Sequence, residues 1–389
     1  MTTTLLTDVT ALDARGEMPG AWILLDGDSI AAVGGAGDAL PGADETVGAG
    51  GAVVTPGLID LHGHGGAGRS FDDGVDAIRA ATAFHRESGT TRSVISLVAN
   101  PTDALSRSLE AVAEVARADE TVLGAHLEGP FLSPGNAGAH HPGFLTSPDP
   151  ALVDALLGAS RGVLRQVTIA PELPGALDAI SRFVDAGVRV GLGHTTADVD
   201  QARAGFDRGA TLLTHAFNAM PGIHHRAPGP IVAALDDERV TLELILDGVH
   251  VDPRVARLLF DAAPSRVALI TDAMAAAGAA DGHYRLGALD VTVDAGTALV
   301  TGTTTIAGST LTQDAALRLA LSAVGLSPRE AVEALTLTPA RALGLDGRLG
   351  LLEPGFAGDL VVWSAEWQPV RVWAGGVPVP SRHQVDRAG

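Results

Sequence analysis

Two histidines separated by one residue, His62 and His64, follow an apolar run in the stretch PGLIDLHGHGGAG (56–68). Residues two apart on a strand face the same side, so both imidazoles can reach one metal ion. Imidazole and carboxylate ligands suit Zn2+ or Fe2+, whereas Ca2+ and Mg2+ prefer shells made mainly of oxygen. The pair alone is also compatible with a polar end to a buried strand, so a metal site requires further ligands.

Further candidate ligands follow other β-like runs of the chain, namely Glu128, His194, His215 and Asp272. Each alone has an ordinary explanation, since a histidine at a strand end is usually only hydrogen-bonded and a carboxylate can cap a helix or pair with arginine. Six such side chains at the ends of five strands are harder to explain separately, and burying them together without a cation would be costly. The pattern therefore predicts a site for a divalent metal.

The amino-acid composition excludes several kinds of catalytic and metal-binding site. The 389 residues contain no cysteine and no lysine, which excludes disulfides, thiolate ligands, a cysteine nucleophile, a Schiff-base lysine and a carbamylated-lysine metal bridge. The formal net charge of −20 argues against nonspecific binding to nucleic acid or to an anionic membrane. An anionic ligand must therefore be held by a local group of arginine, histidine and backbone amides.

The candidate ligands require elements that bring strand ends together. Between residues 53 and 350, short β-like runs alternate with longer helical stretches, which is typical of parallel βα units. The β-like runs number eight and span 53–64, 91–99, 121–129, 164–172, 188–195, 211–218, 241–250 and 266–274. This count predicts an α/β fold with a distorted (β/α)8 TIM barrel, whose active site lies at the C-terminal ends of the strands.

Both ends of the chain lack this alternation. Residues 1–52 and 351–389 contain alternating β-type segments with glycine turns, and neither end has enough apolar surface for its own core. We expect them to combine into one small β-sandwich domain beside a barrel formed by residues 53–350. The Gly- and Thr-rich segment 275–305 follows the eighth strand and is expected to form a hairpin over the active-site mouth.

The N-terminal residues have neither the basic start nor the apolar core of a secretion signal, and no apolar run approaches the roughly 18 to 20 residues of a membrane span. A cytoplasmic location without membrane association is therefore expected. Three histidines fall outside every motif and are expected at the surface, namely His85, His283 and His383.

Seven short motifs follow one another along nearly the whole chain. They are TPGLIDLHGHGGAG (55–68), HLEGPF (126–131), GHT (193–195), THAFNAMPGIHHRAPG (214–229), DGVHVD (247–252), LITDAMAAAG (269–278) and IAGSTLT (306–312). This series resembles the amidohydrolase superfamily and, within it, the N-acetylglucosamine-6-phosphate deacetylase family. The resemblance implies a distorted (β/α)8 barrel with a small β-sandwich built from both chain ends.

The resemblance also implies roles for the candidate ligands. Glu128, His194 and His215 match the principal metal ligands of the family, and Glu128 matches a bridge between two metals. His62 and His64 match a second-metal pair that some members replace with residues that bind no metal. Asp272 matches the catalytic carboxylate and also belongs to the predicted metal set.

The substrate side is implied in the same way. Residues that match phosphate contacts are Asn218, the backbone amide of Ala219, and Arg226. His250 matches a residue that reaches ligand together with Arg226 across a dimer interface, and His140 matches a histidine near the acetyl carbonyl. The family usually has asparagine where this chain has His141, so that loop departs from the pattern. His224 and His225, which precede Arg226, are expected to be solvated.

The activity implied by the resemblance is metal-dependent hydrolysis of N-acetyl-D-glucosamine 6-phosphate to D-glucosamine 6-phosphate and acetate, by a homodimer, in amino-sugar catabolism and cell-wall recycling. Two enzymatic alternatives remain, which are deacetylation of another N-acetyl hexosamine phosphate, such as the galactosamine epimer, and deacylation of an N-acyl amino acid. A noncatalytic amidohydrolase-like scaffold is a third alternative, although such a protein should have lost ligands that are all present here.

Overall fold

The computed structural model describes residues 2–380, and the chain divides into two compact units. The first unit comprises Met1–Asp60, Ala83–Arg92 and Gln313–Gly389, and the second comprises Leu61–Thr82 and Ser93–Thr312. The domain boundaries expected from the sequence, 1–52 plus 351–389 and 53–350, stay a prediction. No helix among the described residues is long and apolar enough to cross a membrane.

A sheet of eight strands forms a nearly closed barrel, as the sequence predicted. Each predicted run overlaps one strand of this sheet. In chain order the strands are β6 (Leu58–Asp60), β9 (Thr90–Val98), β10 (Val122–Glu128), β11 (Leu164–Ile169), β12 (Arg189–Leu192), β13 (Leu212–Leu213), β14 (Thr241–Ile245) and β15 (Val267–Ile270). Neighbours in the sheet follow the chain order from β6 to β15, so the carboxyl ends of the strands meet at one edge.

The segments that follow the first and last barrel strands lie side by side. Gly63 and Ala273 form a parallel bridge, and the amide of Asp272 donates to the carbonyl of His62 at 2.8 Å. The amide of His64 donates to the carbonyl of Ala273 at 2.7 Å. These backbone bonds bring three candidate ligands from opposite ends of the sheet to one place.

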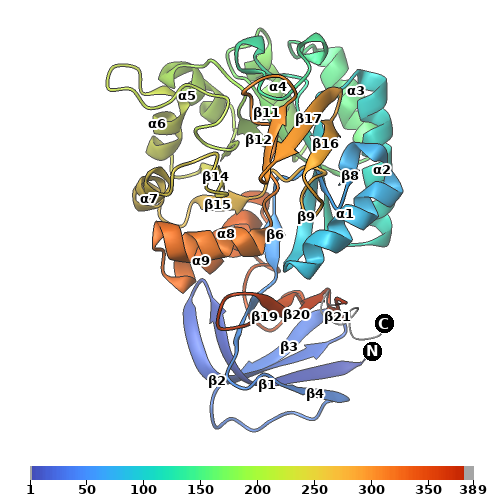
Figure 1. The fold of residues 1–389 in the computed structure, drawn as a ribbon, viewed down its shortest axis with the longest axis vertical. Helices are drawn as coiled ribbons and strands as arrows, with labels where there is room; N and C mark the ends of the chain where they lie inside the picture. Colours follow the sequence, from blue (N-terminus) through green and yellow to red (C-terminus); the bar gives the residue numbers. More distant parts are fainter. Residues whose placement is uncertain (1, 381–389) are drawn as a thin grey trace. The chain divides into compact units, whose positions relative to one another are not determined.

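Helices connect successive barrel strands (Figure 1). In α2, Leu105, Leu109 and Val112 recur at three- and four-residue spacing and are all buried, as in an amphipathic helix. The helices of the described chain are α1 (Val75–Glu87), α2 (Thr102–Ala118), α3 (Pro150–Ser160), α4 (Ala176–Asp185), α5 (Val199–Asp207), α6 (Gly229–Asp236), α7 (Pro253–Ala262), α8 (Gln313–Leu319), α9 (Pro328–Leu335) and α10 (Leu337–Leu343). Shorter helical turns are η1 (Phe71–Asp73), η2 (Pro134–Asn136), η3 (Pro142–Phe144) and η4 (Ala320–Val324).

Both chain ends join in one small β domain, as expected, and its strands form a single continuous sheet. The strands are β1 (Thr3–Asp13), β2 (Gly16–Asp26), β3 (Ser29–Gly34), β4 (Glu45–Gly48), β5 (Val53–Pro56), β19 (Leu360–Trp363), β20 (Pro369–Ala374) and β21 (Val377–Pro378). Figure 1 shows the N-terminal strands, drawn in blue, next to the C-terminal strands, drawn in red. Their core includes Leu6, Ile23, Val54, Leu360 and Trp373.

The first predicted barrel run, 53–64, is divided between two sheets. β5 pairs with β1 and β19 of the terminal sheet, whereas β6 belongs to the barrel sheet. The continuous apolar pattern of this run gave no sign of the division, because both of its parts are buried.

The segment expected as a hairpin, 275–305, contains three antiparallel strands: β16 (Gly282–Leu286), β17 (Leu289–Asp294) and β18 (Thr297–Val300). They share a small core with Val98 and Met274. A two-strand hairpin, β7 (Gly65–Gly66) and β8 (Arg69–Ser70), follows the histidine pair.

Candidate metal centre and active site

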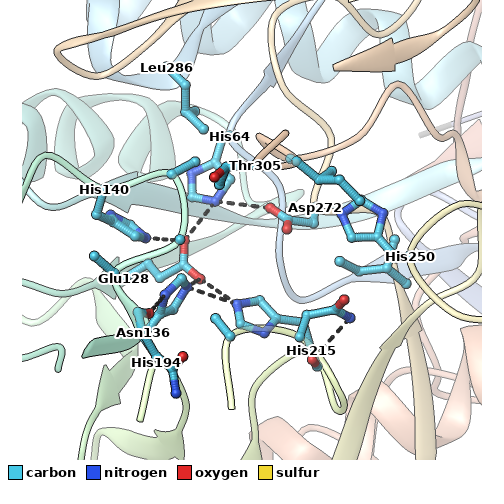
Figure 2. A pocket seen from close by; sticks show the side chains of 18 of the residues that line it. His64, Glu128, Asn136, His140, His194, His215, His250, Asp272, Leu286 and Thr305 are labelled. Carbon is cyan, nitrogen blue, oxygen red and sulfur yellow. Dashed lines mark hydrogen bonds and ion pairs between the residues drawn. The ribbon is translucent and has the colours of Figure 1, made fainter. Parts of the chain in front are cut away.

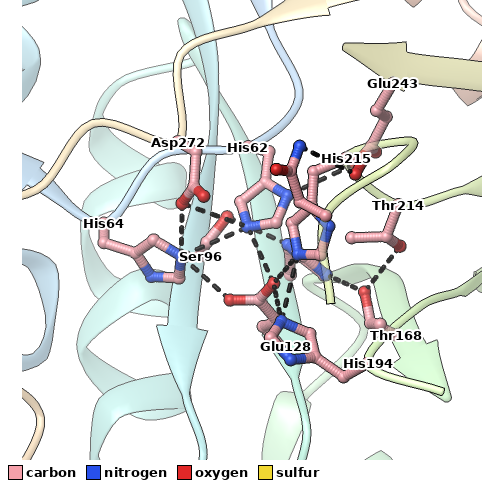
Figure 3. Close-up of polar contacts among 12 residues, drawn as sticks. His62, His64, Ser96, Glu128, Thr168, His194, Thr214, His215, Glu243 and Asp272 are labelled. Atoms are coloured by element: carbon pink, nitrogen blue, oxygen red, sulfur yellow. Dashed lines mark hydrogen bonds and ion pairs between the residues drawn. The ribbon is translucent and has the colours of Figure 1, made fainter. Parts of the chain in front are cut away.

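The structure brings together all six side chains that the sequence nominated as metal ligands (Figure 3). They form two groups, each with ligand atoms within 4.8 Å of one another, and every member is buried. One group consists of His62, His64 and Asp272, and the other consists of Glu128, His194 and His215. The strand-end argument therefore identified residues that do converge at one edge of the barrel.

The Glu128 carboxylate joins the two groups. Its Oε1 atom lies 3.0 Å from Nε2 of His215 and 3.1 Å from Nε2 of His194. Its Oε2 atom lies 3.1 Å from Nε2 of His64. Oε1 also lies 3.3 Å from Nε2 of His62, so this one carboxylate contacts both groups, as a residue shared between two metal sites must.

Two of the histidines are oriented by partners on their outer nitrogens. Nδ1 of His194 lies 3.0 Å from the carbonyl oxygen of Asn136, and Nδ1 of His62 lies 3.3 Å from Oε2 of Glu243. Since a carbonyl and a carboxylate only accept hydrogen bonds, we assign the proton of each neutral ring to Nδ1. The lone pair of Nε2 then points toward the shared centre, as a metal ligand requires.

The inner nitrogens of each group lie close together. His194 and His215 bring their Nε2 atoms to 3.0 Å, and His62 and His64 bring theirs to 3.2 Å, distances that a proton can bridge when no metal is bound. Two nitrogens bound to one tetrahedral Zn2+ lie about 3.3 Å apart, so the spacing also suits a metal ion. The donor set therefore fits a divalent metal in each group.

Several residues at this edge have strained backbones. His194, His215 and Asp272 have φ angles of 45°, 28° and 48°, and Ala219 has a φ of 48°. Residues other than glycine rarely adopt this left-handed region, and each such case costs on the order of 1–3 kcal/mol. Three of six candidate ligands thus lie in conformations that persist only when the surrounding structure enforces them, a pattern that is common at functional sites.

The charges of the two groups are tightly linked. Burial lowers the pKa of His62, but Glu128 and Asp272 outweigh burial and hold that pKa well above its ordinary value. Burial also opposes charge on His64, yet its hydrogen bonds to Asp272 and Glu128 raise its pKa to about 9. Burial raises the pKa of Asp272, but the two histidines lower it to about 2. Asp272 is therefore ionised at neutral pH and able to accept a proton.

His140 is a neutral hydrogen-bond donor beside this centre. Burial is the main cause that lowers its pKa to about 4. The amide of Ala99 donates to its Nδ1 at 3.3 Å, so the ring proton is on Nε2. That nitrogen lies 3.3 Å from Oε2 of Glu128, on the rim of the metal groups.

A cavity of about 380 Å³ opens onto both groups (Figure 2). Its lining includes His64, Glu128, His194, His215 and Asp272, together with four of the five residues expected to bind substrate, namely His140, Asn218, Ala219 and His250. Leu286 and the segment 304–306 also line it, so the excursion after β15 contributes to the cavity, as expected. A small polar ligand can therefore contact metal ligands and predicted substrate residues together.

Arg226, the fifth expected substrate residue, is exposed and does not line this cavity in the single chain. Its neighbours His224 and His225 are exposed, as expected. His250 does line the cavity, and its Nδ1 lies 2.7 Å from Oδ2 of Asp247. Burial opposes protonation of His250, but Asp247 outweighs it and raises the pKa of the ring.

Sequence reasoning missed two buried residues behind the ligands. Glu243 on β14 contacts His62, and His126 on β10 lies between the hydroxyls of Ser96 and Thr168, at 2.9 Å and 2.8 Å. The signal was present, because His126 is two residues before Glu128 and must face the same side of its strand.

The expectation for the remaining histidines was correct in part. His85 was expected at the surface, but its exposed fraction is only 4%, so that expectation was wrong. The reason is that His85 lies on α1 with its ring against Phe84, on a part of the helix that other elements cover. His283 is exposed, and His383 lies outside the described residues.

A nearly closed parallel barrel with two His/carboxylate groups at one edge is the architecture of metal-dependent hydrolases. The chain belongs to the amidohydrolase family, whose family model matches residues 53–379. Its ligand groups and its family together indicate a divalent metal cofactor.

Similar proteins are deacetylases of amino-sugar phosphates. A solved structure of an N-acetyl-D-glucosamine-6-phosphate deacetylase variant from Mycobacterium smegmatis, in complex with N-acetyl-D-glucosamine 6-phosphate, is 44% identical, with a TM-score of 0.93 over 98% of this chain and 100% of that chain. The N-acetylgalactosamine-6-phosphate deacetylase of Escherichia coli O157:H7 is 40% identical over 83% of this chain and 87% of its own length. The N-acetylglucosamine-6-phosphate deacetylase of Bos taurus is 36% identical over 82% of this chain and 81% of its own length.

Proposed function

We propose that this chain hydrolyses N-acetyl-D-glucosamine 6-phosphate to D-glucosamine 6-phosphate and acetate. The observation that carries the proposal is the position of Asp272, an ionised carboxylate that lines the same cavity as the Glu128-bridged ligand groups and His140. Relatives at 36% and 44% identity that are named for this reaction support the choice of substrate.

Hydrolysis of an amide is difficult because the amide is a poor electrophile and water is a poor nucleophile near neutral pH. A bound divalent metal supplies a Lewis acid that lowers the pKa of water and polarises a carbonyl. Glu128, His194 and His215 would hold one ion, and His62, His64 and Asp272 would contribute to a second. This chain has no lysine and therefore no carbamylated lysine to bridge two metal ions. Glu128 would take the place of that bridge.

Asp272 then acts as base and afterwards as acid. Its carboxylate takes a proton from the attacking water and delivers it to the departing amine, so that one group serves both halves of the reaction. His140 donates its Nε2–H to the acetyl oxygen as negative charge develops there. Both roles use atoms that border the cavity.

The 6-phosphate is recognised by Asn218, the backbone amide of Ala219, Arg226 and His250. Because Arg226 does not line the cavity within one chain, we propose a homodimer in which Arg226 and His250 complete the phosphate site between two copies. A guanidinium fork binds a phosphate dianion bidentately and anchors the substrate away from the reacting amide. Such an anchor must be local in a chain with a net charge of −20.

The metal is proposed to be Zn2+ or Fe2+, because ligands of imidazole and carboxylate suit both ions. Two ions per subunit are proposed because both groups keep complete sets of side chains. Because the product is an amino-sugar phosphate, we propose that the reaction belongs to amino-sugar catabolism and cell-wall recycling. We also propose that the enzyme is in the cytoplasm.

One observation favours a second substrate. The relative from Escherichia coli O157:H7, at 40% identity, is named for the galactosamine epimer. The two sugars differ only in the configuration at C4, so both would present the same acetamide and the same phosphate to the residues named above.

An acetate-release assay separates these possibilities. Metal-loaded protein of known metal content is given N-acetylglucosamine and N-acetylgalactosamine, each with and without the 6-phosphate. The proposal predicts the highest kcat/KM for N-acetylglucosamine 6-phosphate, whereas preference for the phosphorylated galactosamine epimer would replace it with the second candidate. Turnover that does not depend on phosphate would favour an acylase instead.

A further inference from the structure

Glu243 is a wholly buried carboxylate that lies immediately behind the metal ligands. It is on β14, with an exposed fraction of 0%, and its backbone carbonyl accepts from the amide of Ala216 at 2.8 Å. Its Oε1 atom accepts from Nε2 of Gln166 at 2.7 Å, and its Oε2 atom lies 3.3 Å from Nδ1 of His62 (Figure 3). A buried carboxylate is expensive unless positive charge or hydrogen bonds compensate for it.

No arginine among residues 2–380 forms an ion pair with Glu243, so beside the amide of Gln166 its compensation comes through His62. The ring of His62 has Glu243 on its outer nitrogen, while its Nε2 lies 3.3 Å from Oε1 of Glu128 and 3.2 Å from Nε2 of His64. The ring therefore connects a buried anion on one side to a predicted cation on the other. A carboxylate behind a ligating imidazole fixes its tautomer and strengthens it as a ligand.

The two ligand groups differ in this respect. In the group that contains His62, His64 has no hydrogen-bond partner for Nδ1 within the described residues. In the other group, Nδ1 of His194 is held by the carbonyl of Asn136. Among the described residues, Glu243 is thus the one carboxylate that contacts the outer nitrogen of a histidine in either group.

We infer that Glu243 is a positioning residue for His62 and that it sets the affinity of the His62/His64/Asp272 group for its metal ion, with Gln166 holding Glu243 in place. This inference rests on the proposed function, because it requires that this group binds a cation. It predicts that damage to Glu243 empties one ion site and leaves the other filled.

The test compares Glu243→Gln and Glu243→Leu with the wild type. Glutamine keeps an acceptor for the His62 proton but removes the charge, and leucine removes both. Protein dialysed against Zn2+ is measured for bound zinc, and the dissociation constants are measured by calorimetric titration. We expect one of the two sites to lose about 10- to 100-fold in affinity in Glu243→Gln and more in Glu243→Leu, while the other site is unchanged.

Thr168→Val is the matched control. Thr168 is also wholly buried in the barrel, on β11, but its hydroxyl contacts His126 and Thr214 and no predicted ligand. This variant should keep two zinc ions with wild-type affinities. If it loses an ion as the Glu243 variants do, the effect is general damage to the barrel core and the positioning role is refuted.

Gln166→Met gives a second test if Glu243→Leu does not fold. It removes the amide that holds Oε1 of Glu243 and keeps the carboxylate, so a smaller loss at the same site is expected. Two tightly bound zinc ions with unchanged affinities in the Glu243 and Gln166 variants would overturn the inference. A wild type that binds neither Zn2+ nor Fe2+ would instead overturn the proposed function. A wild type that binds one ion would overturn the inference and the proposal of two ions per subunit, and acetate release by that protein would leave the proposed activity standing.

Discussion

Oδ1 of Asp272 lies 3.2 Å from Nε2 of His64, although the two residues are 208 positions apart in the sequence. The contact arises because the segments after β6 and β15 run side by side where the barrel closes. It places the one carboxylate assigned a proton-transfer role at the edge of a metal group and in the wall of the cavity.

Replacement of Asp272 by asparagine should remove proton transfer with little change in shape. We expect kcat for N-acetylglucosamine 6-phosphate to fall by about 10²- to 10⁴-fold, which is the usual contribution of general acid and base catalysis. KM should change little, because binding depends mainly on the phosphate. The exposed Asp290 provides the control, since Asp290→Asn should keep wild-type kcat. A loss below tenfold in metal-loaded Asp272→Asn would contradict the assigned role.

Removal of the histidine pair should separate the two ion sites. In His62→Gln/His64→Asn, bound metal should fall from two ions per subunit to one, because Glu128, His194 and His215 remain. Elemental analysis of dialysed wild-type and variant protein provides the count. Equal counts in the two proteins would show that the pair holds no ion.

Arg226→Ala should weaken the use of phosphorylated substrate. Charge-assisted hydrogen bonds contribute about 1.5–3 kcal/mol, so kcat/KM for N-acetylglucosamine 6-phosphate should fall by about 10- to 150-fold. Turnover of unphosphorylated N-acetylglucosamine should be nearly unchanged. His225→Ala, on the same exposed loop, is the control and should behave as the wild type. An equal loss on both substrates would rule out an anchoring role.

Metal binding should release protons and become tighter as the pH rises. Without a cation, His64 has a pKa of about 9 and is protonated at neutral pH, and His62 also has a raised pKa. A metal must displace these protons, so each released proton lowers the apparent Kd about tenfold per pH unit below about pH 9. Calorimetry in two buffers with different ionisation enthalpies measures the number released. A Kd that is constant between pH 6 and pH 8 would contradict this linkage.

The barrel and the six ligands could be predicted from the sequence, because the alternation of strand and helix patterns determines where the strand ends meet. Once eight parallel strands are recognised, their carboxyl ends must meet, so residues such as His194 and Asp272 must be neighbours. Glu243 was not predicted from the sequence, because it lies within its strand and not at the strand end, with apolar residues on both sides. Glu243 is two residues before Ile245, which lines the cavity, so both side chains face the same side of the strand. This spacing could have pointed to Glu243.

Other features could not be read from one chain's sequence. The burial of His85 depends on which elements cover α1, and the division between β5 and β6 depends on which strands pair with each. The exposed position of Arg226 could not be read from its motif, since a motif fixes the order of residues and not which copy of the chain completes a site.

A stability prediction concerns the first unit. Arg92 and Asp359 form a buried two-point ion pair, with Nε to Oδ2 at 2.6 Å and Nη2 to Oδ1 at 3.2 Å. Asp359→Asn removes the carboxylate charge from this buried pair and should lower the free energy of unfolding by about 3–5 kcal/mol.

The control for this prediction is Glu110→Gln, which removes an exposed ion pair with Arg161 and should cost less than about 1 kcal/mol. Equilibrium urea denaturation of the three proteins provides the comparison. Similar losses in both variants would show that burial does not determine the importance of the Arg92–Asp359 pair.

The most direct measurement is the release of acetate from N-acetylglucosamine 6-phosphate by protein of known metal content. We predict acetate and D-glucosamine 6-phosphate in equal amounts, loss of activity when a chelator strips the metal, and recovery when Zn2+ or Fe2+ is restored. Absence of acetate from every phosphorylated N-acetyl hexosamine, or release that persists after the metal is removed, would contradict the account.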